Sequence, residues 1–412
     1  MTETINVAII GAGPYGLSVA AHLRGAGVPF EIFGSPLESW REHMPEKMIL
    51  RSETFASSLS DPENRYTQEA FCKTRGIPYR KSGPTLSKQQ FLDYADWFQR
   101  QAVPNVKDVK VIRLARQDDG FSLAFDNGET AFAKNVVVAT GHRPFRTVPP
   151  SLRELSPELV SHSDDHRDLT KFINKDVVVV GGGQSALEIA ALLHEQGTKT
   201  RIIIREDHVV WLDPHLGERT PLQERLWPET GLGYGWKNYA IAAFPKLFSL
   251  LPRSERFRIG LGKIGPAGGW WLRDRVVGKI PLLTSHEILL ARDVGGSVRL
   301  TVHAGGNTFE TDTDHVIAAT GYTPDVARLG YLDRATLANL KTFKGLPLLG
   351  PACESSVPGL FFVGMLSAAT FGPAMRFIAG TGHSGKMLAR RLAGTVKRPS
   401  QRGVPVAGYP AR

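Results

Sequence analysis

The sequence INVAIIGAGPYG at residues 5–16 decides the fold. The apolar run at 5–10 is typical of a strand buried on both faces of a parallel sheet. It leads into Gly11-x-Gly13-x-x-Gly16, then into a helical pattern and a second apolar strand at 28–33. In such a unit the glycines permit a tight turn, leave backbone bare beside a pyrophosphate, and let the helix close on the sheet. The stretch therefore predicts a dinucleotide site with phosphates at the helix N-terminus, and a merely tight turn is the alternative.

The acidic residue that usually holds the ribose of a dinucleotide is displaced in this sequence. Glu31 has the nominal spacing, but it lies inside the second strand, whose end is occupied by Gly34 and Ser35. Either the Ser35 hydroxyl and nearby backbone replace the carboxylate, or Glu31 is a solvated or helix-facing residue. We favour the first interpretation. The predicted contacts of this first nucleotide begin with Gly11, Gly13, Pro14, Tyr15, Gly16, Gly34 and Ser35.

Length and composition narrow the class of protein. A chain of 412 residues suits two or three domains, and its net charge of +10 is scattered along the sequence. Scattered basic residues favour a phosphorylated cofactor or an acidic partner over nucleic acid. The two cysteines, Cys72 and Cys353, lie far apart, which argues against a disulfide framework, a metal site and a redox dithiol. No leader is recognised and no apolar run approaches the roughly 18–20 residues of a membrane span, so we expect a cytoplasmic protein without a transmembrane segment.

The same plan recurs later in the chain. A strand at 176–180 leads into Gly181-x-Gly183-x-x-Ala186, and a helix and another strand follow. Each copy of this plan ends in Ala-Thr-Gly, the first at 139–141 and the second at 319–321. Such a repeat predicts an α/β fold with two Rossmann-like dinucleotide-binding domains, the second inserted into the first. We expect the first domain at 1–165 and 325–395, the second at 170–324, and a disordered tail at 396–412.

Between these motifs lie further elements. Ser87 and Gln90 form a capping box, and short strands are expected at 109–115, 121–125, 130–133 and 135–141. A helix is expected at 372–392, with glycines that allow close packing. Residues 212–280 read as an aromatic-rich helical insertion with a small core of its own. The alternatives are a lid over the substrate or a patch that meets a partner or membrane surface.

The second turn predicts NADPH. The strand after its helix ends at Arg205, where an acidic side chain would favour NADH and a guanidinium suits a 2′-phosphate. Arg205 as a plain surface charge is the alternative. Gln184 and Ser185 at the helix start can add donors to the phosphates, although Ser185 can also be a simple helix cap. With NADPH at the second site, FAD is the dinucleotide that fits the first, which implies hydride transfer from nicotinamide to flavin.

Five segments together resemble the class B flavoprotein monooxygenases, which comprise the flavin-containing, Baeyer–Villiger and N-hydroxylating enzymes. These segments are GAGPYG, Trp40-Arg41, VATGHRP at 138–144, VVGGGQSA at 179–186 and ATGYTP at 319–324. The histidine-containing linker at 161–166 is similar too. The resemblance implies that NADPH reduces FAD, that O₂ forms a C4a-peroxyflavin, and that one oxygen atom passes to a small-molecule substrate.

The resemblance also implies roles for residues. Trp40 and Arg41 flank the flavin, Thr140-Gly141 and Thr320-Gly321 mark chain crossings beside FAD and NADPH, and Gly364 opens the last flavin-contacting turn. Substrate-pocket candidates are His43, Met44, Arg51, Ser52 and Phe371, each of which can instead be core or cofactor packing. The sequence departs from the patterns of the family at three places. Serines at 57–58 stand where the ornithine and lysine N-hydroxylases have a substrate-binding lysine, and the Baeyer–Villiger fingerprint is absent. Met365 stands where related two-dinucleotide oxidoreductases have an aspartate.

We therefore expect an FAD- and NADPH-dependent monooxygenase that performs N- or S-oxygenation. Baeyer–Villiger oxidation is the next hypothesis. A reductase that passes electrons from NADPH to a protein acceptor and a non-catalytic flavoprotein binding module are the rivals. The expected partners are a small-molecule substrate and O₂, without nucleic acid or metal, and a homo-oligomer is compatible with the sequence. The sequence assigns no general acid or base.

Overall fold

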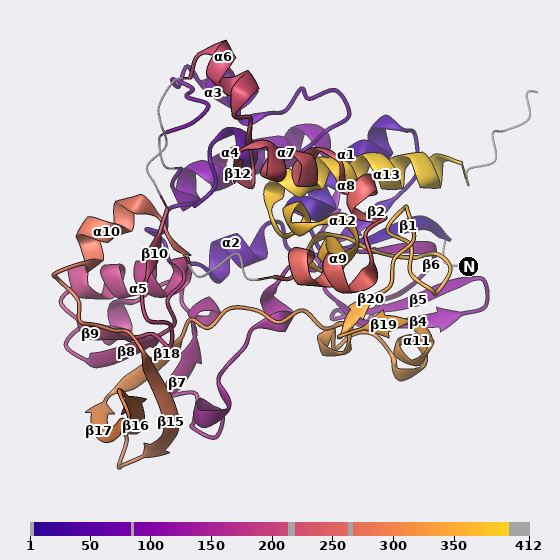
Figure 1. Ribbon diagram of the computed structural model, residues 1–412. Helices are drawn as coiled ribbons and strands as arrows, with labels where there is room; N and C mark the ends of the chain where they lie inside the picture. Colours follow the sequence, from indigo (N-terminus) through magenta and orange to yellow (C-terminus); the bar gives the residue numbers. More distant parts are fainter. Residues whose placement is uncertain (1–3, 84–85, 213–218, 263–266, 395–412) are drawn as a thin grey trace, which may run out of the picture.

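A computed structural model describes residues 4–83, 86–212, 219–262 and 267–394 (Figure 1). The tail predicted to be disordered, 396–412, lies outside these residues. The first sheet is built on β1 (Ile5–Ile10), which is parallel to β2 (Glu31–Phe33) on one side and to β6 (Thr130–Val138) on the other. Its strand order is β3-β2-β1-β6-β5-β4, with β3 at Val106–Lys107, β5 at Gly120–Phe125 and β4 at Val111–Gln117.

One long strand replaces two short ones expected in this sheet. The strands predicted at 130–133 and 135–141 are the single strand β6, whose first half pairs antiparallel with β5. Its second half pairs in parallel with β21 (Leu360–Phe362), which comes from the far end of the chain. Pairing with β6 therefore places the C-terminal segment at the edge of the sheet where the glycine turn after β1 lies.

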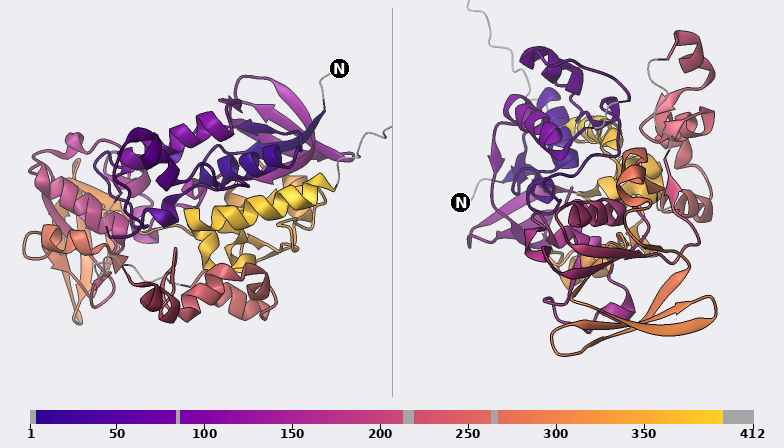
Figure 2. Two further views of the ribbon diagram at one scale, coloured as in Figure 1. Left: turned by 90° about the horizontal axis from the view of Figure 1, so that it is seen from above. Right: turned by 90° about the vertical axis from the view of Figure 1, so that its left-hand side faces the viewer.

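Helices cover this sheet. They are α1 (Pro14–Gly25), α2 (Glu38–Glu42), α3 (Gln68–Arg75), α4 (Lys88–Ala102) and α13 (Thr381–Ala393). The predicted capping box at Ser87 and Gln90 is present at the start of α4. Helix α13 runs along α1, because a Cβ on Gly385 would lie 2.3 Å from the His22 ring and only glycine permits that approach (Figure 2). The aromatic side chains on one face of α4, including Tyr94 and Phe98, are buried in the core.

The helix predicted at 372–392 is wrong over residues 372–380. Gly372 has φ +98, a left-handed conformation that begins two short 3₁₀ turns at Pro373–Arg376 and Ile378–Gly380. Only from Thr381 does the chain become α-helical. The irregular segment turns toward the nucleotide cavity instead of covering the sheet.

The second sheet is entirely parallel. Its order is β14-β9-β8-β18-β7, with β14 at Leu282–Leu283, β9 at Lys199–Ile203, β8 at Asp176–Val180, β18 at His315–Ala318 and β7 at Val160–His162. Helix α5 (Gln184–Glu195) follows β8 and packs on it, while β15 (His286–Asp293), β16 (Val298–Ala304) and β17 (Asn307–Thr313) form an antiparallel meander. Every strand of this sheet lies in sequence between β6 and β21, so the predicted fold class is confirmed. The domain boundaries in residue numbers stay a prediction.

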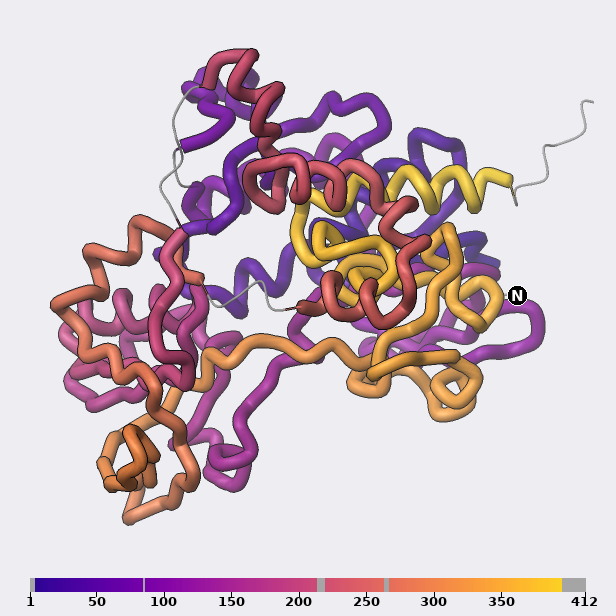
Figure 3. Tube along the Cα trace, viewed as in Figure 1, coloured from indigo at the N-terminus to yellow at the C-terminus, as the bar shows by residue number. Residues whose placement is uncertain are grey.

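The chain passes between the two domains near residues 140–150 and again near 320–330 (Figure 3). These two crossings follow the two Ala-Thr-Gly motifs. They are tied together where Thr147 N donates to Gly321 O at 2.9 Å and Thr323 N donates to Phe145 O at 2.7 Å.

The insertion contains α6 (Pro221–Leu226), α7 (Trp236–Ala243), α8 (Pro245–Phe248), α9 (Arg253–Gly260) and α10 (Trp270–Val276), with short strands β10 (Val210–Trp211), β11 (Glu229–Thr230), β12 (Gly233–Tyr234) and β13 (Ala267–Gly268). The small core predicted for it is wrong for the described residues. Leu272 and Val276 of α10 belong to the core of the second domain, and Phe257 of α9 belongs to that of the first. Helices α8 and α9 pack on α12 (Ala368–Phe371).

The remaining elements are η1 (Phe55–Ser57), η2 (Arg143–Phe145), η3 (Pro150–Leu152), η4 (Ser163–Asp165), η5 (Thr170–Phe172), η6 (Val326–Arg328), η7 (Gly364–Ser367), α11 (Arg334–Asn339), β19 (Thr342–Phe343) and β20 (Leu346–Pro347). Among the described helices, none is long and apolar enough to cross a membrane.

Candidate functional site

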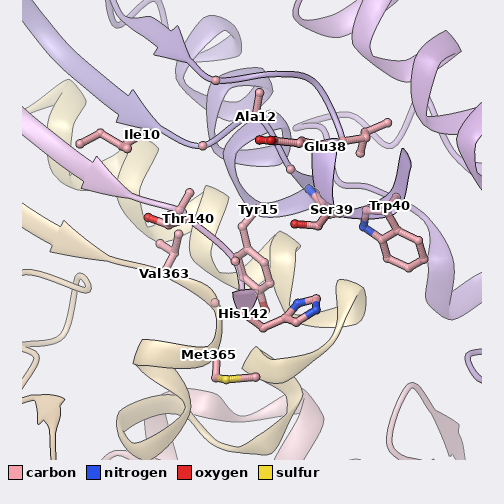
Figure 4. Close-up of a pocket in the computed structure, with 18 of the residues that line it drawn as sticks. Ile10, Ala12, Tyr15, Glu38, Ser39, Trp40, Thr140, His142, Val363 and Met365 are labelled. Carbon is pink, nitrogen blue, oxygen red and sulfur yellow. The ribbon is translucent and has the colours of Figure 1, made fainter. Parts of the chain in front are cut away.

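The first cavity lies where parallel strands β1, β2, β6 and β21 end (Figure 4). Carboxyl ends of parallel strands are where dinucleotides bind in such sheets. Ten of the residues predicted for the first nucleotide line this cavity: Gly11, Gly13, Pro14, Tyr15, Gly34, Ser35, Trp40, Thr140, Gly141 and Gly364.

The glycines of the first turn fit a bound pyrophosphate. A Cβ on Gly11, at φ +109, would lie 2.5 Å from Ala139 O, and one on Gly16 would lie 1.8 Å from Gly11 O. A Cβ on Gly13 would meet no atom within 4 Å, although Gly13 lines the cavity. Gly11 and Gly16 are thus required by the protein's own packing, whereas bare backbone at Gly13 leaves space for a ligand. This cradle matches the phosphates of FAD.

The ribose end has Ser35 in the cavity and Glu31 outside its lining. The Ser35 hydroxyl donates to Asp108 Oδ1 at 2.5 Å, while Glu31 accepts from Lys107 Nζ at 2.8 Å. Glu31 is therefore held in an ion pair on the sheet's surface, and the role of Ser35 at the ribose stays a prediction. Arg41, unlike Trp40, does not line the cavity; it bonds to Asp96 and to Pro36 O.

The far end of the first cavity is formed by the irregular C-terminal segment. Met375, Arg376, Phe377 and Ile378 line it. The Tyr15 hydroxyl lies 2.8 Å from Met375 O and 3.0 Å from Phe377 O, so it anchors this segment to the start of α1. Burial raises the pKa of Tyr15 well above its ordinary value, which keeps the hydroxyl a donor.

The second cavity opens at the ends of β8, β9 and β18, and Gly181, Gly183, Arg205, Thr320 and Gly321 line it as predicted. Gly181 has φ +133, and a Cβ there would lie 2.4 Å from Ala319 O. The Arg205 side chain is 68% exposed and 3.6 Å from Glu206 Oε1, so its guanidinium is available to an anion at the rim. This arrangement fits the phosphates of NADPH.

Gln184 and Ser185 do not line the second cavity. Gln184 accepts from Gly269 N at 2.7 Å and donates to Glu188 Oε2 at 2.9 Å, so its amide ties the insertion to α5. Ser185 faces a third, smaller cavity that adjoins both crossings and is lined by His43, Met44, Pro45, Met48, His142, Ser163, Asp164, Ser185, Glu188, Ile189 and Tyr322. Its accessible volume is ≈ 110 Å³.

Asp164 is the centre of this third cavity. Tyr322 Oη donates to Asp164 Oδ1 at 2.8 Å, His142 Nε2 lies 3.9 Å from the same oxygen, and His43 Nδ1 lies 3.2 Å from Asp164 O. The side chain is 4% exposed, and Oδ2 has no hydrogen-bond partner among the described residues. The His142 ring stands edge-on to Tyr322, with centroids 4.4 Å apart.

Protonation within this group is set chiefly by burial. Burial lowers the pKa of His142, against the opposing charge of Asp164, and raises that of Tyr322. At neutral pH the imidazole is therefore uncharged and the phenol keeps its proton. Because His142 also lines the first cavity, it connects the FAD cavity to the space between the domains.

Glu188 is a fully buried acid on the opposite wall. Its Oε1 accepts from Ile49 N at 2.7 Å and its Oε2 accepts from Gln184 Nε2. Burial raises its pKa to about 7, because two donors only partly offset the loss of water. The bond to Ile49 holds the chain just before Arg51 and Ser52 against α5.

Three substrate-pocket candidates lie outside the three cavities. Phe371 is fully buried, with its ring 5.4 Å from that of His383. Arg51 and Ser52 are partly buried, and burial next to Arg376 lowers the pKa of Arg51. His43 and Met44, by contrast, line the third cavity. Reasoning from sequence missed Asp164, Glu188, His142, Tyr322 and Arg376 as site residues. Two of them directly follow the Ala-Thr-Gly motifs, which is the signal that could have identified them.

Known proteins share this plan. A family model described as Pyridine nucleotide-disulphide oxidoreductase matches residues 8–223. The chain is 28% identical over 206 residues to indole-3-pyruvate monooxygenase YUCCA1 of Oryza sativa subsp. japonica, an alignment that covers 48% of this chain and only 47% of that protein. It is 27% identical over 344 residues to probable indole-3-pyruvate monooxygenase YUCCA8 of Arabidopsis thaliana, with 77% and 75% covered. The solved structure of the Kutzneria sp. 744 ornithine N-hydroxylase KtzI, with reduced FAD and NADP⁺, superposes with a TM-score of 0.76 at 18% identity and covers 96% of this chain and 100% of that one.

Two nucleotide cavities on either side of a pair of crossings, together with these likenesses, bear out the resemblance to the class B flavoprotein monooxygenases and to their use of FAD and NADPH. The chain belongs to the pyridine nucleotide-disulphide oxidoreductase family. The resemblance and the two cofactors predicted from the sequence are confirmed.

Proposed function

We propose that the protein is an NADPH-dependent monooxygenase that adds one oxygen atom from O₂ to a nitrogen or sulfur atom of a small molecule. The overall reaction consumes substrate, O₂, NADPH and a proton, and yields oxygenated substrate, NADP⁺ and water. When bound, NADPH supplies the hydride, and FAD accepts it and activates oxygen. The observation that carries the proposal is the direct contact between the two crossings, where Tyr322 and His142 meet Asp164.

The chain's own residues bind and orient. Gly13 and its neighbours receive the FAD phosphates, and Arg205 receives the 2′-phosphate of NADPH. Tyr15 holds the segment containing Met375 and Arg376 against the first cavity. The contact of the Tyr322 ring with His142 keeps the two crossings in register, so that the cavities keep one relative position. Precise placement of two cofactors accounts for much of the rate in a hydride transfer.

The choice of nitrogen or sulfur rests on chemistry at the third cavity and on likeness. The His142 imidazole is uncharged in this cavity. A neutral imidazole does not protonate a bound amine, so the amine can remain the free base. The likeness to KtzI, whose name describes N-hydroxylation, extends over nearly the whole chain and supports an amine as the first substrate class to test. Serines at 57–58 argue against a basic amino acid.

The experiment is oxygenation with isotopically labelled O₂. FAD-loaded protein and NADPH are incubated with a panel of primary amines and thioethers, and the masses of the products are measured by mass spectrometry. One labelled oxygen atom per product, formed in step with NADPH consumption, is the expected result. NADPH oxidation without a labelled product for any compound, combined with fast reduction of ferredoxin, would favour the reductase instead.

A further inference from the structure

The insertion exposes an unusual concentration of apolar side chains. Among the described residues, nine of the 17 large apolar side chains that are exposed fall between residues 222 and 251. We call these nine the apolar patch: Leu222, Leu226, Trp227, Trp236, Tyr239, Phe244, Leu247, Leu250 and Leu251. Leu250 is 79% exposed and Trp227 is 60% exposed. Clustered exposure of this kind marks an interaction surface, whereas single exposed apolar residues do not.

Contacts between the side chains show that much of the patch is continuous. The Trp236 ring lies 5.5 Å from that of Tyr239, which in turn lies 6.3 Å from Phe244. Trp236 Nε1 donates to Leu226 O at 3.1 Å, which brings the end of α6 beside the start of α7. Helices α7, α8 and α9 of the insertion lie on one side of the molecule, against the C-terminal segment (Figure 2).

The same helices have an inner face that is already occupied. A Cβ on Gly372 would lie 3.5 Å from Ile241 Cγ2 and 3.5 Å from Phe248 Cγ, so these two side chains point toward the first domain. Phe248 is 5% exposed, whereas the neighbouring Leu247 is 61% exposed. The apolar patch therefore includes the outer face of α7 and α8, which the fold leaves without a described partner.

Around the larger part of the patch, residues 231–254, the charge has one sign. From residue 231 to 254 the sequence contains Lys237, Lys246 and Arg253 and no aspartate or glutamate. All three basic side chains belong to exposed residues. The acids within and beside the patch have partners: Glu224 pairs with Lys81 at 2.7 Å, Glu229 accepts from Ser82 at 3.0 Å, and Glu255 pairs with Arg258 at 2.6 Å.

We propose that the apolar patch docks on the surface of an anionic phospholipid bilayer. Leucine and aromatic side chains enter the interface between headgroups and acyl chains, and lysines beside them pair with lipid phosphates. Tryptophan and tyrosine are the side chains that favour this depth. A second copy of the chain fits less well, because a two-fold contact would bring Lys237 and Lys246 against the same basic surface without an acid to neutralise them. The proposal does not depend on the reaction.

The test is flotation of the full-length, FAD-loaded protein with vesicles. Vesicles of phosphatidylcholine with phosphatidylglycerol should carry the protein to the top of the gradient, and phosphatidylcholine alone should carry little. The double variants Leu247→Glu/Leu250→Glu and Lys237→Glu/Lys246→Glu should each bind about tenfold or more weakly, and added salt should weaken wild-type binding. Bound FAD and circular dichroism confirm that each variant is folded.

Matched controls lie elsewhere on the surface. Leu289→Glu alters an exposed leucine of β15, and Lys134→Glu alters an exposed lysine of β6; both should bind like wild type. Wild-type protein that ignores anionic vesicles, or charge-reversed protein that binds them normally, would overturn the proposal. So would a wild-type dimer in light scattering that Leu247→Glu converts to monomer without vesicles, since the occupant would then be a second copy.

Discussion

Tyr322 Oη donates to Asp164 Oδ1 at 2.8 Å, although the two residues are 158 positions apart in the chain. Tyr322 follows the second Ala-Thr-Gly motif, and Asp164 lies between β7 and β8 of the second domain. The bond therefore fixes the second crossing to the second domain, beside His142 of the first crossing. Because Asp164 is almost fully buried, the bond also compensates for the burial of its charge.

Removing this bond tests its strength. Tyr322→Phe keeps the ring against His142 but leaves Asp164 Oδ1 without its donor, so the free energy of unfolding should fall by about 1–3 kcal/mol. Urea denaturation measures the change. Tyr239→Phe is the control, because that ring lies in the exposed patch and its hydroxyl has no described partner. Equal effects of the two substitutions would remove the special role of the buried bond.

Gly13→Ala separates cofactor binding from folding. Gly13 has φ −82, and its added methyl group would meet no protein atom within 4 Å. The variant should unfold at the wild-type urea concentration but bind FAD at least about tenfold more weakly, because the methyl occupies space meant for the pyrophosphate. Gly330→Ala, also with nothing within 4 Å and away from the cavity, should match wild type in both measurements. Normal FAD affinity in Gly13→Ala would move the pyrophosphate elsewhere.

Arg205→Ala tests the nucleotide preference of the second cavity. Loss of a charged hydrogen bond to the 2′-phosphate should weaken NADPH binding by about 1–3 kcal/mol and leave NADH binding nearly unchanged. Fluorescence titration of both nucleotides measures the difference. Arg292→Ala, at an exposed arginine of β15, should change neither. If Arg205→Ala weakens the binding of NADPH and NADH equally, the Arg205 guanidinium does not bind the 2′-phosphate.

Glu188 predicts a pH dependence of stability. Burial raises its pKa in the folded protein from 4.5 to about 7. Between these values the folded state binds more protons than the unfolded state, so the free energy of unfolding should fall as pH rises, by up to about 3 kcal/mol. In Glu188→Gln this fall should be absent. The free energy of unfolding of the variant, minus that of the wild type, should therefore increase with pH between about 4.5 and 7.

Urea denaturation at several pH values provides the comparison. Glu154→Gln, at an exposed glutamate, should retain the wild-type slope. A Glu188→Gln variant whose stability follows pH as steeply as wild type would show that Glu188 stays ionised when buried.

Local patterns predicted the cradles well. Gly11, Gly16 and Gly181 are each required by a contact within one strand–turn–helix unit or with the adjacent strand, and periodicity plus glycine spacing is sufficient to find them. The pattern also predicted correctly that Glu31 lies inside the strand β2 and that Ser35 follows it; the ribose contact itself stays a prediction.

The third cavity could not be predicted in the same way. Asp164, Glu188 and His43 meet only because two domains close on each other, and no periodicity encodes contacts across such distances in sequence. Similarly, the segment after Gly372 has helical composition, but packing of Met375 and Phe377 carbonyls onto Tyr15 overrides that propensity. The insertion lacks its own core because Phe257 and Leu272 find partners in the two flanking domains.

The central claim is that the two cavities deliver reducing equivalents from NADPH to FAD within one chain. Stopped-flow mixing of FAD-loaded protein with NADPH under anaerobic conditions tests it most directly. The visible flavin band should bleach with one equivalent of NADPH, and NADH at the same concentration should act more slowly. A protein that retains no FAD, or whose FAD band NADPH cannot bleach, would contradict it.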